Sequence, residues 1–291
     1  MTTYRSPGSD PGSLVMASIR VLGFFILIVA LVPVHLIYGF CRPDDPCRMP
    51  RSFHRLLVRL LGFQVRVHGS MAVTPPVLFV ANHSSYLDIP VLGALIPGAF
   101  IAKAEVERWP LFGVLARLQR TVFVERRSAR TGDHRNEMRA RLANGQNLIL
   151  FPEGTSSDGM CVLPFKSGLF GAIEDKATPV PILVQPVSIT CTEIDGLPIT
   201  RAWRPYYAWF GDMTLVGHLW NVFKLGRFTV DVVFHAPLSP AAFADRKALA
   251  AHCRQQVAYG IELCLTGRHT HPEIMAKITA TEAALAAVPQ L

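Results

Sequence analysis

A histidine and an aspartate lie five positions apart in the segment NHSSYLD, residues 82–88. A neutral His83 can take a proton from a hydroxyl group when a partner holds its ring in the required tautomer. Asp88 lies on the next helical turn and can accept a hydrogen bond from the Nδ1–H group of that ring. The pair is therefore typical of a general base acting on a hydroxyl group, which a substrate can supply. A turn histidine that caps a helix is the competing interpretation, and the motif taken alone favours it.

A second polar cluster follows an apolar run at residues 147–151, which ends at a proline. Glu153 and Gly154 come next, and Lys166 follows after a polar stretch. A glycine at the end of a strand allows close approach of the backbone to a ligand. Glu153 can orient a hydroxyl group, and Lys166 with a helix N-terminus beyond it can hold an anion. Because this second cluster is present, the sequence favours a functional site over a histidine that only caps a helix.

Alternating strand-like and helical runs must position these clusters. The predicted strands lie at residues 64–69, 77–81, 99–103, 121–125, 147–151, 180–189 and 228–234. The predicted helices lie at residues 88–96, 110–119, 128–145, 167–177 and 239–267. Such alternation predicts an α/β fold with a largely parallel sheet flanked by helices. Active residues in such folds collect where strands end and helices begin, which is where both clusters stand.

The N-terminal region has a different composition. Residues 1–13 are polar and rich in Gly, Pro and Ser, which predicts a disordered tail. The run from Val21 to Phe40 contains no Asp, Glu, Lys or Arg, and about 20 apolar residues suffice for a membrane helix. Pro33 and His35 leave open a kinked or half-inserted helix. The arginines after the run predict that this side faces the cytoplasm, at an inner or plasma membrane.

A second N-terminal helix is predicted from Ser52 to Phe63, where apolar residues recur at helical spacing. Two interpretations of its apolar face stay open: packing against the core of the protein, or lying in the membrane interface. With the preceding run it makes residues 14–63 a membrane-anchoring region.

NHSSYLD and FPEGT, about seventy residues apart, resemble the first and third sequence blocks of the glycerolipid acyltransferase family, which includes the 1-acylglycerol-3-phosphate acyltransferases. The segments RTVFVERR and VPILVQPVSI stand where that family has its second and fourth blocks. The resemblance extends over roughly residues 60–235. It implies an acyltransferase domain, which we place at residues 64–270, followed by a C-terminal tail at residues 271–291.

The resemblance implies specific roles. His83 would be the general base on the acceptor hydroxyl, and Asp88 would orient it. The hydroxyl oxygen would attack the thioester of an acyl carrier protein or of coenzyme A, with no acyl-enzyme and no metal or other cofactor. The acceptor would be held by residues of the other blocks, namely Arg126, Glu153, Gly154, Thr155 and Lys166.

Two departures from the family pattern bear on the acceptor. Arg120 stands where the family's second block begins with glycine, and Ser156 stands where an arginine often follows FPEGT. A missing arginine weakens the case for a phosphate-bearing acceptor. The segment at residues 210–220 resembles a subgroup of lyso-ornithine lipid acyltransferases, although an ordinary loop and helix would explain it equally well. Our first expectation is acylation of 1-acylglycerol-3-phosphate to phosphatidic acid, with acylation of lyso-ornithine lipid close behind.

Composition limits the remaining function classes. The chain has 50% hydrophobic residues and a net charge of +8, which suits membrane lipids and an acidic carrier protein as partners. No recognition motif accompanies the charge, so we do not expect nucleic acid binding. The six cysteines form no CxxC pair and are predicted to be free thiols. A non-catalytic lipid-binding membrane protein is the alternative of another class, and the base at His83 argues against it.

Overall fold

The computed structural model describes residues 12–42, 45, 47–73, 76–125, 131–173, 181–270 and 273. In this part of the chain, one eight-stranded sheet forms the centre of the fold, and its main path has the order β1-β8-β6-β2-β5-β3-β4. In that order the strands are β1 (Phe63–His68), β8 (Phe228–Phe234), β6 (Leu183–Ile194), β2 (Val77–Ala81), β5 (Asn147–Leu150), β3 (Gly98–Lys103) and β4 (Val122–Val124). The short β7 (Leu197–Pro198) pairs with β6. All neighbours pair in parallel except β6 with β8 and β7, which confirms the predicted largely parallel sheet.

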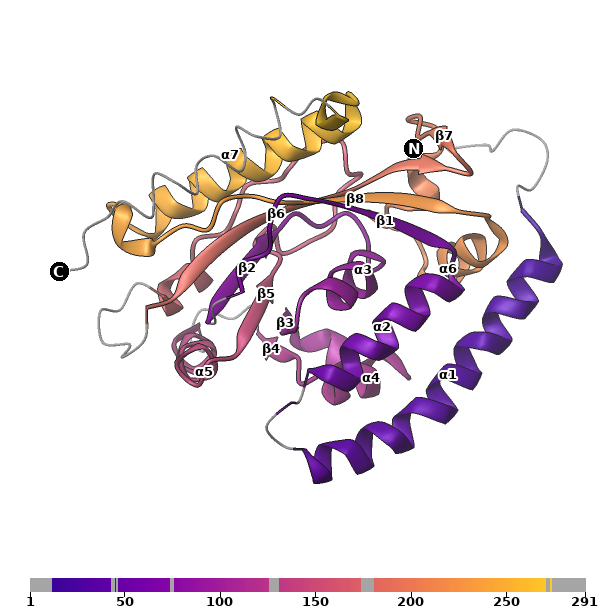
Figure 1. Ribbon diagram of the computed structural model, residues 1–291, viewed down its shortest axis with the longest axis horizontal. Coiled ribbons are helices and arrows are strands. Elements are labelled where there is room, and N and C mark those ends of the chain that lie inside the picture. Colours follow the sequence, from indigo (N-terminus) through magenta and orange to yellow (C-terminus); the bar gives the residue numbers. More distant parts are fainter. Residues whose placement is uncertain are drawn as a thin grey trace.

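Helices cover both faces of the sheet (Figure 1). Every residue of β2 is buried, because Phe79 faces one hydrophobic cluster and Leu78 faces the other. The first cluster includes residues of α1 (Leu14–Cys41), α2 (Arg48–Leu60), α3 (Asp88–Leu95) and α6 (Leu215–Lys224). The second includes residues of α5 (Thr131–Ala143) and α7 (Arg246–Leu265). The short η1 (Ala104–Arg108) and α4 (Phe112–Leu118) pack against each other between β3 and β4 in the sequence.

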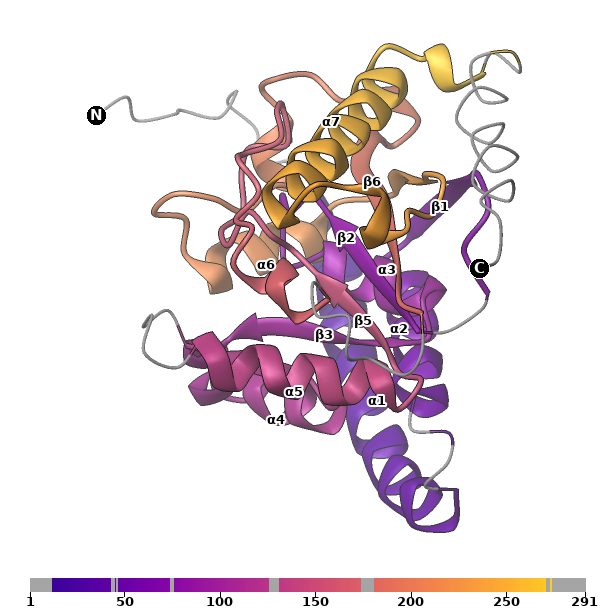
Figure 2. The ribbon, with the colours of Figure 1, turned by 90° about the vertical axis from the view of Figure 1, so that its left-hand side faces the viewer.

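Helix α1 begins seven residues before the predicted apolar run, because the hydroxyl of Ser13 caps it by accepting from the N–H of Met16. Its N-terminal half is fixed to the fold by Arg20, whose guanidinium donates to carbonyls at the end of α6 and to the carbonyl of Gly226. The C-terminal end of α1 extends past the rest of the molecule (Figure 2). By length and composition α1 can cross a membrane, and its exposed apolar side chains are compatible with membrane association.

Helix α2 begins four residues before the predicted start and packs against α3. His54 and Val58 are buried on its inner face, and the side chains of Arg51 and Arg55 both donate to the carbonyl of Ala94. The inner face of α2 therefore packs on the protein's own core, whereas Leu56 of the predicted apolar face is 37% exposed.

Two further predicted elements differ from those in the structure. Strand β6 continues to Ile194, five residues past its predicted end, because it pairs antiparallel with β8. The predicted helix at 167–177 is instead a single 3₁₀ turn at Leu169–Ala172, and residues 174–180 lie outside the described part of the chain. Most of the predicted tails, residues 1–11 and nearly all of 271–291, also lie outside it.

Candidate active site

His83 and Asp88 meet at the C-terminal end of β2. His83 lies in the turn after the strand, and Asp88 is the first residue of α3. The Nδ1 atom of His83 lies 3.1 Å from Oδ2 of Asp88. Because an ionised carboxylate can only accept, Nδ1 carries the proton and Nε2 of the neutral ring carries the lone pair. The side chain of His83 is 20% exposed and that of Asp88 is 0% exposed. The geometry is therefore that of an oriented general base.

The carboxylate of Asp88 receives donors on both oxygens. Backbone N–H groups of Ser84 and Ser85 donate to Oδ2 at 2.8 and 2.9 Å. The hydroxyl of Tyr207 donates to Oδ1 at 2.9 Å, and the hydroxyl of Ser84 lies 3.4 Å from the same oxygen. Burying an ionised carboxylate is costly unless such donors replace water. These four contacts explain how Asp88 can remain a charged partner for the histidine ring.

The turn that carries His83 is fixed to the neighbouring strand by Asn82. The side-chain amide of Asn82 donates to the carbonyl of Ile189 and accepts from its N–H, both at 2.8 Å. The two bonds replace the ladder pairing that β2 loses where it turns away from β6. An asparagine fits here because its side chain offers one donor and one acceptor, as a backbone peptide does.

The side-chain carboxylate of Glu153 contacts the main chain of His83. The residue is 2% exposed. One carboxylate oxygen accepts from the N–H of His83 at 2.8 Å, and the other accepts from the N–H of Leu163 at 3.0 Å. Burial raises the pKa of Glu153 to about 7, against the opposing effect of these two N–H groups. The structure thus places Glu153 at the site in a position that fixes the backbone under the base.

The other predicted site residues surround the same loop. Gly154 has φ of +67°, and a Cβ atom there would lie 2.8 Å from Nζ of Lys166, so the glycine makes room for the lysine. Thr155 and Lys166 are exposed at this edge. Arg126 lies outside the described residues.

The segment at residues 203–210, which was not predicted to belong to the site, contacts the site residues. Tyr207 contacts Asp88, and the N–H of Trp209 donates to the carbonyl of Ser84 at 2.9 Å. The hydroxyl of Ser156 donates to the carbonyl of Trp209 at 2.5 Å. The aromatic run at residues 203–210 was the signal available in the sequence, but nothing local links it to residues 84–88.

An apolar cavity of about 160 Å³ adjoins the His83 turn. Tyr86, Leu87 and Ile89 form one wall, and residues of α1, α2, η1, α4 and α6 contribute to the others. Phe53, His54, Leu115 and Gln119 separate it from a second cavity of about 60 Å³ that α1 closes.

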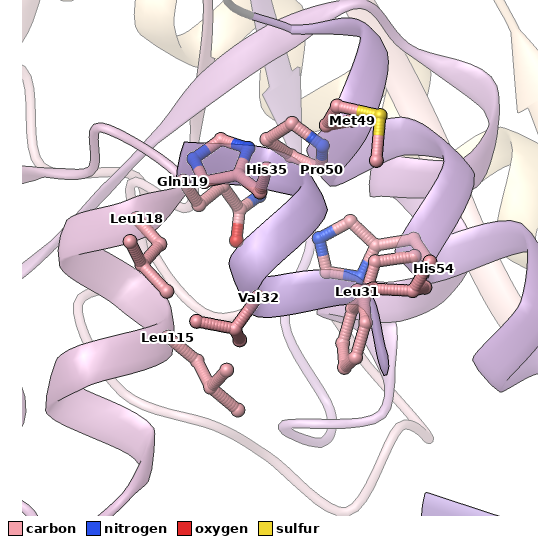
Figure 3. A pocket seen from close by; sticks show the side chains of 10 residues that line it. Leu31, Val32, His35, Met49, Pro50, His54, Leu115, Leu118 and Gln119 are labelled. Carbon is pink, nitrogen blue, oxygen red and sulfur yellow. The ribbon is translucent and has the colours of Figure 1, made fainter. Parts of the chain in front are cut away.

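Figure 3 shows this second cavity, with Leu31, Val32 and His35 of α1 along one side. His54 is buried, and burial lowers its pKa to about 4, so the wall between the cavities is uncharged at neutral pH.

The sequence is similar to a known protein family over much of its length. The model of the family described as Acyltransferase matches residues 64–190. The lyso-ornithine lipid O-acyltransferase of Brucella abortus is 41% identical, over 83% of this chain and 92% of its own length. The chain belongs to this acyltransferase family.

Two further proteins are similar to this chain. The 1-acyl-sn-glycerol-3-phosphate acyltransferase of Neisseria gonorrhoeae is 36% identical, over 71% of this chain and 80% of its own length. The crystal structure of the 1-acyl-sn-glycerophosphate (LPA) acyltransferase PlsC from Thermotoga maritima matches with a TM-score of 0.65 and 25% identity, covering 86% of this chain and 94% of that one. These matches confirm the predicted family, fold and enzyme class.

Proposed function

We propose that the protein is a lysolipid O-acyltransferase whose acceptor is lyso-ornithine lipid. The observation that carries the O-acyl transfer is the His83–Asp88 pair, in which a buried carboxylate orients a partly exposed imidazole. A base in this orientation suits removal of a proton from an alcohol.

The reaction uses one base and no covalent enzyme intermediate. Nε2 of His83 takes the proton from the acceptor hydroxyl as its oxygen bonds to the thioester carbonyl carbon. Asp88 stabilises the imidazolium that forms. When the tetrahedral intermediate collapses, the C–S bond breaks and the imidazolium returns its proton to the leaving thiolate. The products are the ester and the free thiol of the carrier.

The apolar cavity beside Tyr86 is where we place an acyl chain. Its walls are almost entirely apolar, and it begins at the same turn that carries His83. Burial of a hydrocarbon chain there contributes about 0.8 kcal/mol for each CH₂ group. A chain held in this cavity would bring its carboxyl end towards the base.

The loop after FPEGT supports the choice of acceptor. Ser156 stands where an arginine is frequent in the family, and Asp158 follows two residues later. The loop is tied to the base, because the N–H of Ser157 donates to the carbonyl of His83 at 3.0 Å. Without an arginine at this position the loop lacks a charge-assisted contact to a phosphate, which weakens the case for a phosphate-bearing acceptor. The identity of 41% to a lyso-ornithine lipid acyltransferase points the same way.

The second candidate acceptor is 1-acylglycerol-3-phosphate. The exposed Lys166 above Gly154 offers a cation at the site, and a relative with 36% identity is named for this acceptor. Both candidates are lysolipids with a free hydroxyl group, so the mechanism is the same for each.

We also propose that the enzyme works on the cytoplasmic face of the membrane. The exposed apolar side chains of α1 would contact lipid, and arginines follow on α2. The acyl donor would then be drawn from the cytoplasm, as the thioester of an acyl carrier protein or of coenzyme A.

The test is an acceptor-by-donor assay of the purified full-length protein. We expect wild type to acylate lyso-ornithine lipid faster than 1-acylglycerol-3-phosphate, and His83→Ala to lose about 10²–10⁴-fold in rate with either. His252→Ala, on α7, is the matched control. Faster acylation of the phosphate lipid would select the second candidate. A correctly folded wild type that binds lysolipid but acylates neither acceptor from either donor would instead indicate a non-catalytic binding protein.

A further inference from the structure

Three side chains that the acyl-transfer site does not use converge at the edge of the sheet where β1 and β8 pair. They are His68 at the end of β1, Asp231 in the middle of β8, and His269 in η6 (Arg268–Thr270), which follows α7. One possible ligand atom of each lies within 4.8 Å of the others. The positions are 68, 231 and 269, so no local spacing in the sequence indicates the cluster.

The two histidines face the same oxygen of the aspartate. Nε2 of His68 lies 2.7 Å from Oδ1 of Asp231, and Nε2 of His269 lies 3.8 Å from it. The carboxylate is 0% exposed, while the His68 and His269 side chains are 18% and 9% exposed. The cluster is thus buried on the protein side and reachable from solvent on the His68 side.

Neighbouring groups orient two of the three side chains. Nδ1 of His269 lies 3.4 Å from the carbonyl of Leu263, and because a carbonyl only accepts, Nδ1 carries the proton. The Nε2 atom of a neutral His269 therefore directs its lone pair at the carboxylate. The hydroxyl of Thr192 donates to the other oxygen, Oδ2, at 2.5 Å. A proton or a metal ion between that nitrogen and the buried carboxylate would remove their repulsion.

We infer that His68, Asp231 and His269 form a binding site for a divalent transition-metal ion of the zinc class. Two imidazoles and one carboxylate with an open position are a familiar ligand set for such ions. Bonds of about 2.0–2.2 Å place neighbouring ligand atoms of a tetrahedral ion roughly 3.3 Å apart. The separations of 2.7 and 3.8 Å from Oδ1 of Asp231 bracket that value, and the ligand atoms of the two histidines lie within 4.8 Å of each other. Movements on the order of an ångström would therefore bring all three ligands to bonding distance. A carbonyl behind one histidine and a hydroxyl behind the carboxylate are the supports that metal ligands commonly have.

The site would join three elements that are distant in the sequence. A bound ion would hold the turn after α7 against the edge of the sheet formed by β1 and β8, and so stabilise the folded protein. Metal that binds only the folded state raises its stability as its concentration exceeds Kd. The role is structural, and it stands whether or not the proposed acyl acceptor is correct.

The experiment measures zinc binding to the full-length protein, which is purified without a histidine tag, stripped with a chelator and then incubated with zinc. We expect one zinc ion per chain by elemental analysis after dialysis, a rise in Tm on adding zinc, and visible absorption bands when Co²⁺ replaces zinc. His269→Ala removes a ligand from the terminal turn and should weaken zinc binding by at least about 100-fold. Thr192→Val keeps all three ligands and should weaken it by about 10–100-fold.

His252→Ala, which removes a histidine of α7 outside the cluster, is the matched control and should bind zinc as wild type does. The inference is overturned if wild type retains no zinc after dialysis, since the cluster would then be a hydrogen-bonded group alone. It is equally overturned if His269→Ala and wild type bind zinc with the same stoichiometry and Kd, because the ion would then lie elsewhere.

Discussion

Asp88→Asn tests the central geometric claim about the base, because it removes a charge while preserving shape. The amide oxygen can occupy the position of Oδ2 and accept from the N–H groups of Ser84 and Ser85, as the carboxylate does. The NH₂ group would then face the hydroxyl of Tyr207, which can turn to accept. We therefore expect the variant to fold.

The magnitude follows from the distance to the ring. Nδ1 of His83 lies 3.1 Å from the carboxylate, and two unit charges at that distance attract by about 5 kcal/mol at an effective dielectric constant of about 20. The attraction acts on the imidazolium formed during the reaction, whereas the neutral ring of the resting enzyme gains little from it. The amide dipole retains part of the interaction. The remaining loss corresponds to a fall in kcat of about 10²–10⁴-fold.

The assay is steady-state acylation with the preferred acceptor, with kcat and KM determined separately. We expect the loss in kcat and little change in KM, because Asp88 is buried and lies behind the base. Asp212→Asn makes the same chemical change at an exposed position and is the control. A folded Asp88→Asn enzyme with kcat within about threefold of wild type would show that His83 does not become a cation in the rate-limiting step.

Three further outcomes are expected. Tyr207→Phe should lower the free energy of unfolding by about 1–3 kcal/mol in urea titrations, since a buried carboxylate loses a donor; no change would refute the contact. Burial raises the pKa of Glu153 from 4.5 to about 7, so its contribution is complete below pH 4.5 and up to about 3 kcal/mol is lost as the pH rises through 7. Glu153→Gln should lack that loss in unfolding measured across this range, and parallel curves would contradict the assignment. Placing Glu at both Ile26 and Val29, which are exposed on α1, should reduce sedimentation with lipid vesicles, whereas Glu at exposed Leu197 should not.

The elements predicted correctly from the sequence are those that depend on the pattern of neighbouring residues. Strands β2 and β8 begin and end where predicted, because both are short runs rich in apolar and β-branched residues bounded by polar or turn residues. The His83–Asp88 pair was predictable for the same reason: the partners are five positions apart, and the helix start at Asp88 fixes their geometry. A short separation leaves few ways for the chain to place the two groups.

The parts that escaped prediction depend on contacts between distant segments. Tyr207 stands 119 residues from Asp88, and the turn around Trp209 reaches Ser84 only after β6 has crossed the sheet. Glu153 was expected to face a substrate, and the structure shows its oxygens accepting from two backbone N–H groups. A carboxylate after a strand looks the same in the sequence whether it binds substrate or backbone, because tertiary packing determines which groups it contacts.

Taken with its neighbours, His83 is restrained along three directions. Glu153 holds its backbone N–H, Asp88 holds Nδ1, and the ring stacks on Phe151 with a centroid separation of 4.2 Å. A base fixed in this way needs little reorganisation when the proton moves, which is how preorganised sites lower a barrier. The two carboxylates divide the work: Glu153 positions the main chain and Asp88 supports the charge that appears on the ring. Glu153 can fulfil its part in either protonation state, since a protonated carboxyl still accepts, but Asp88 must be ionised. The surroundings match that difference, because Asp88 has four donors besides the ring and Glu153 has two.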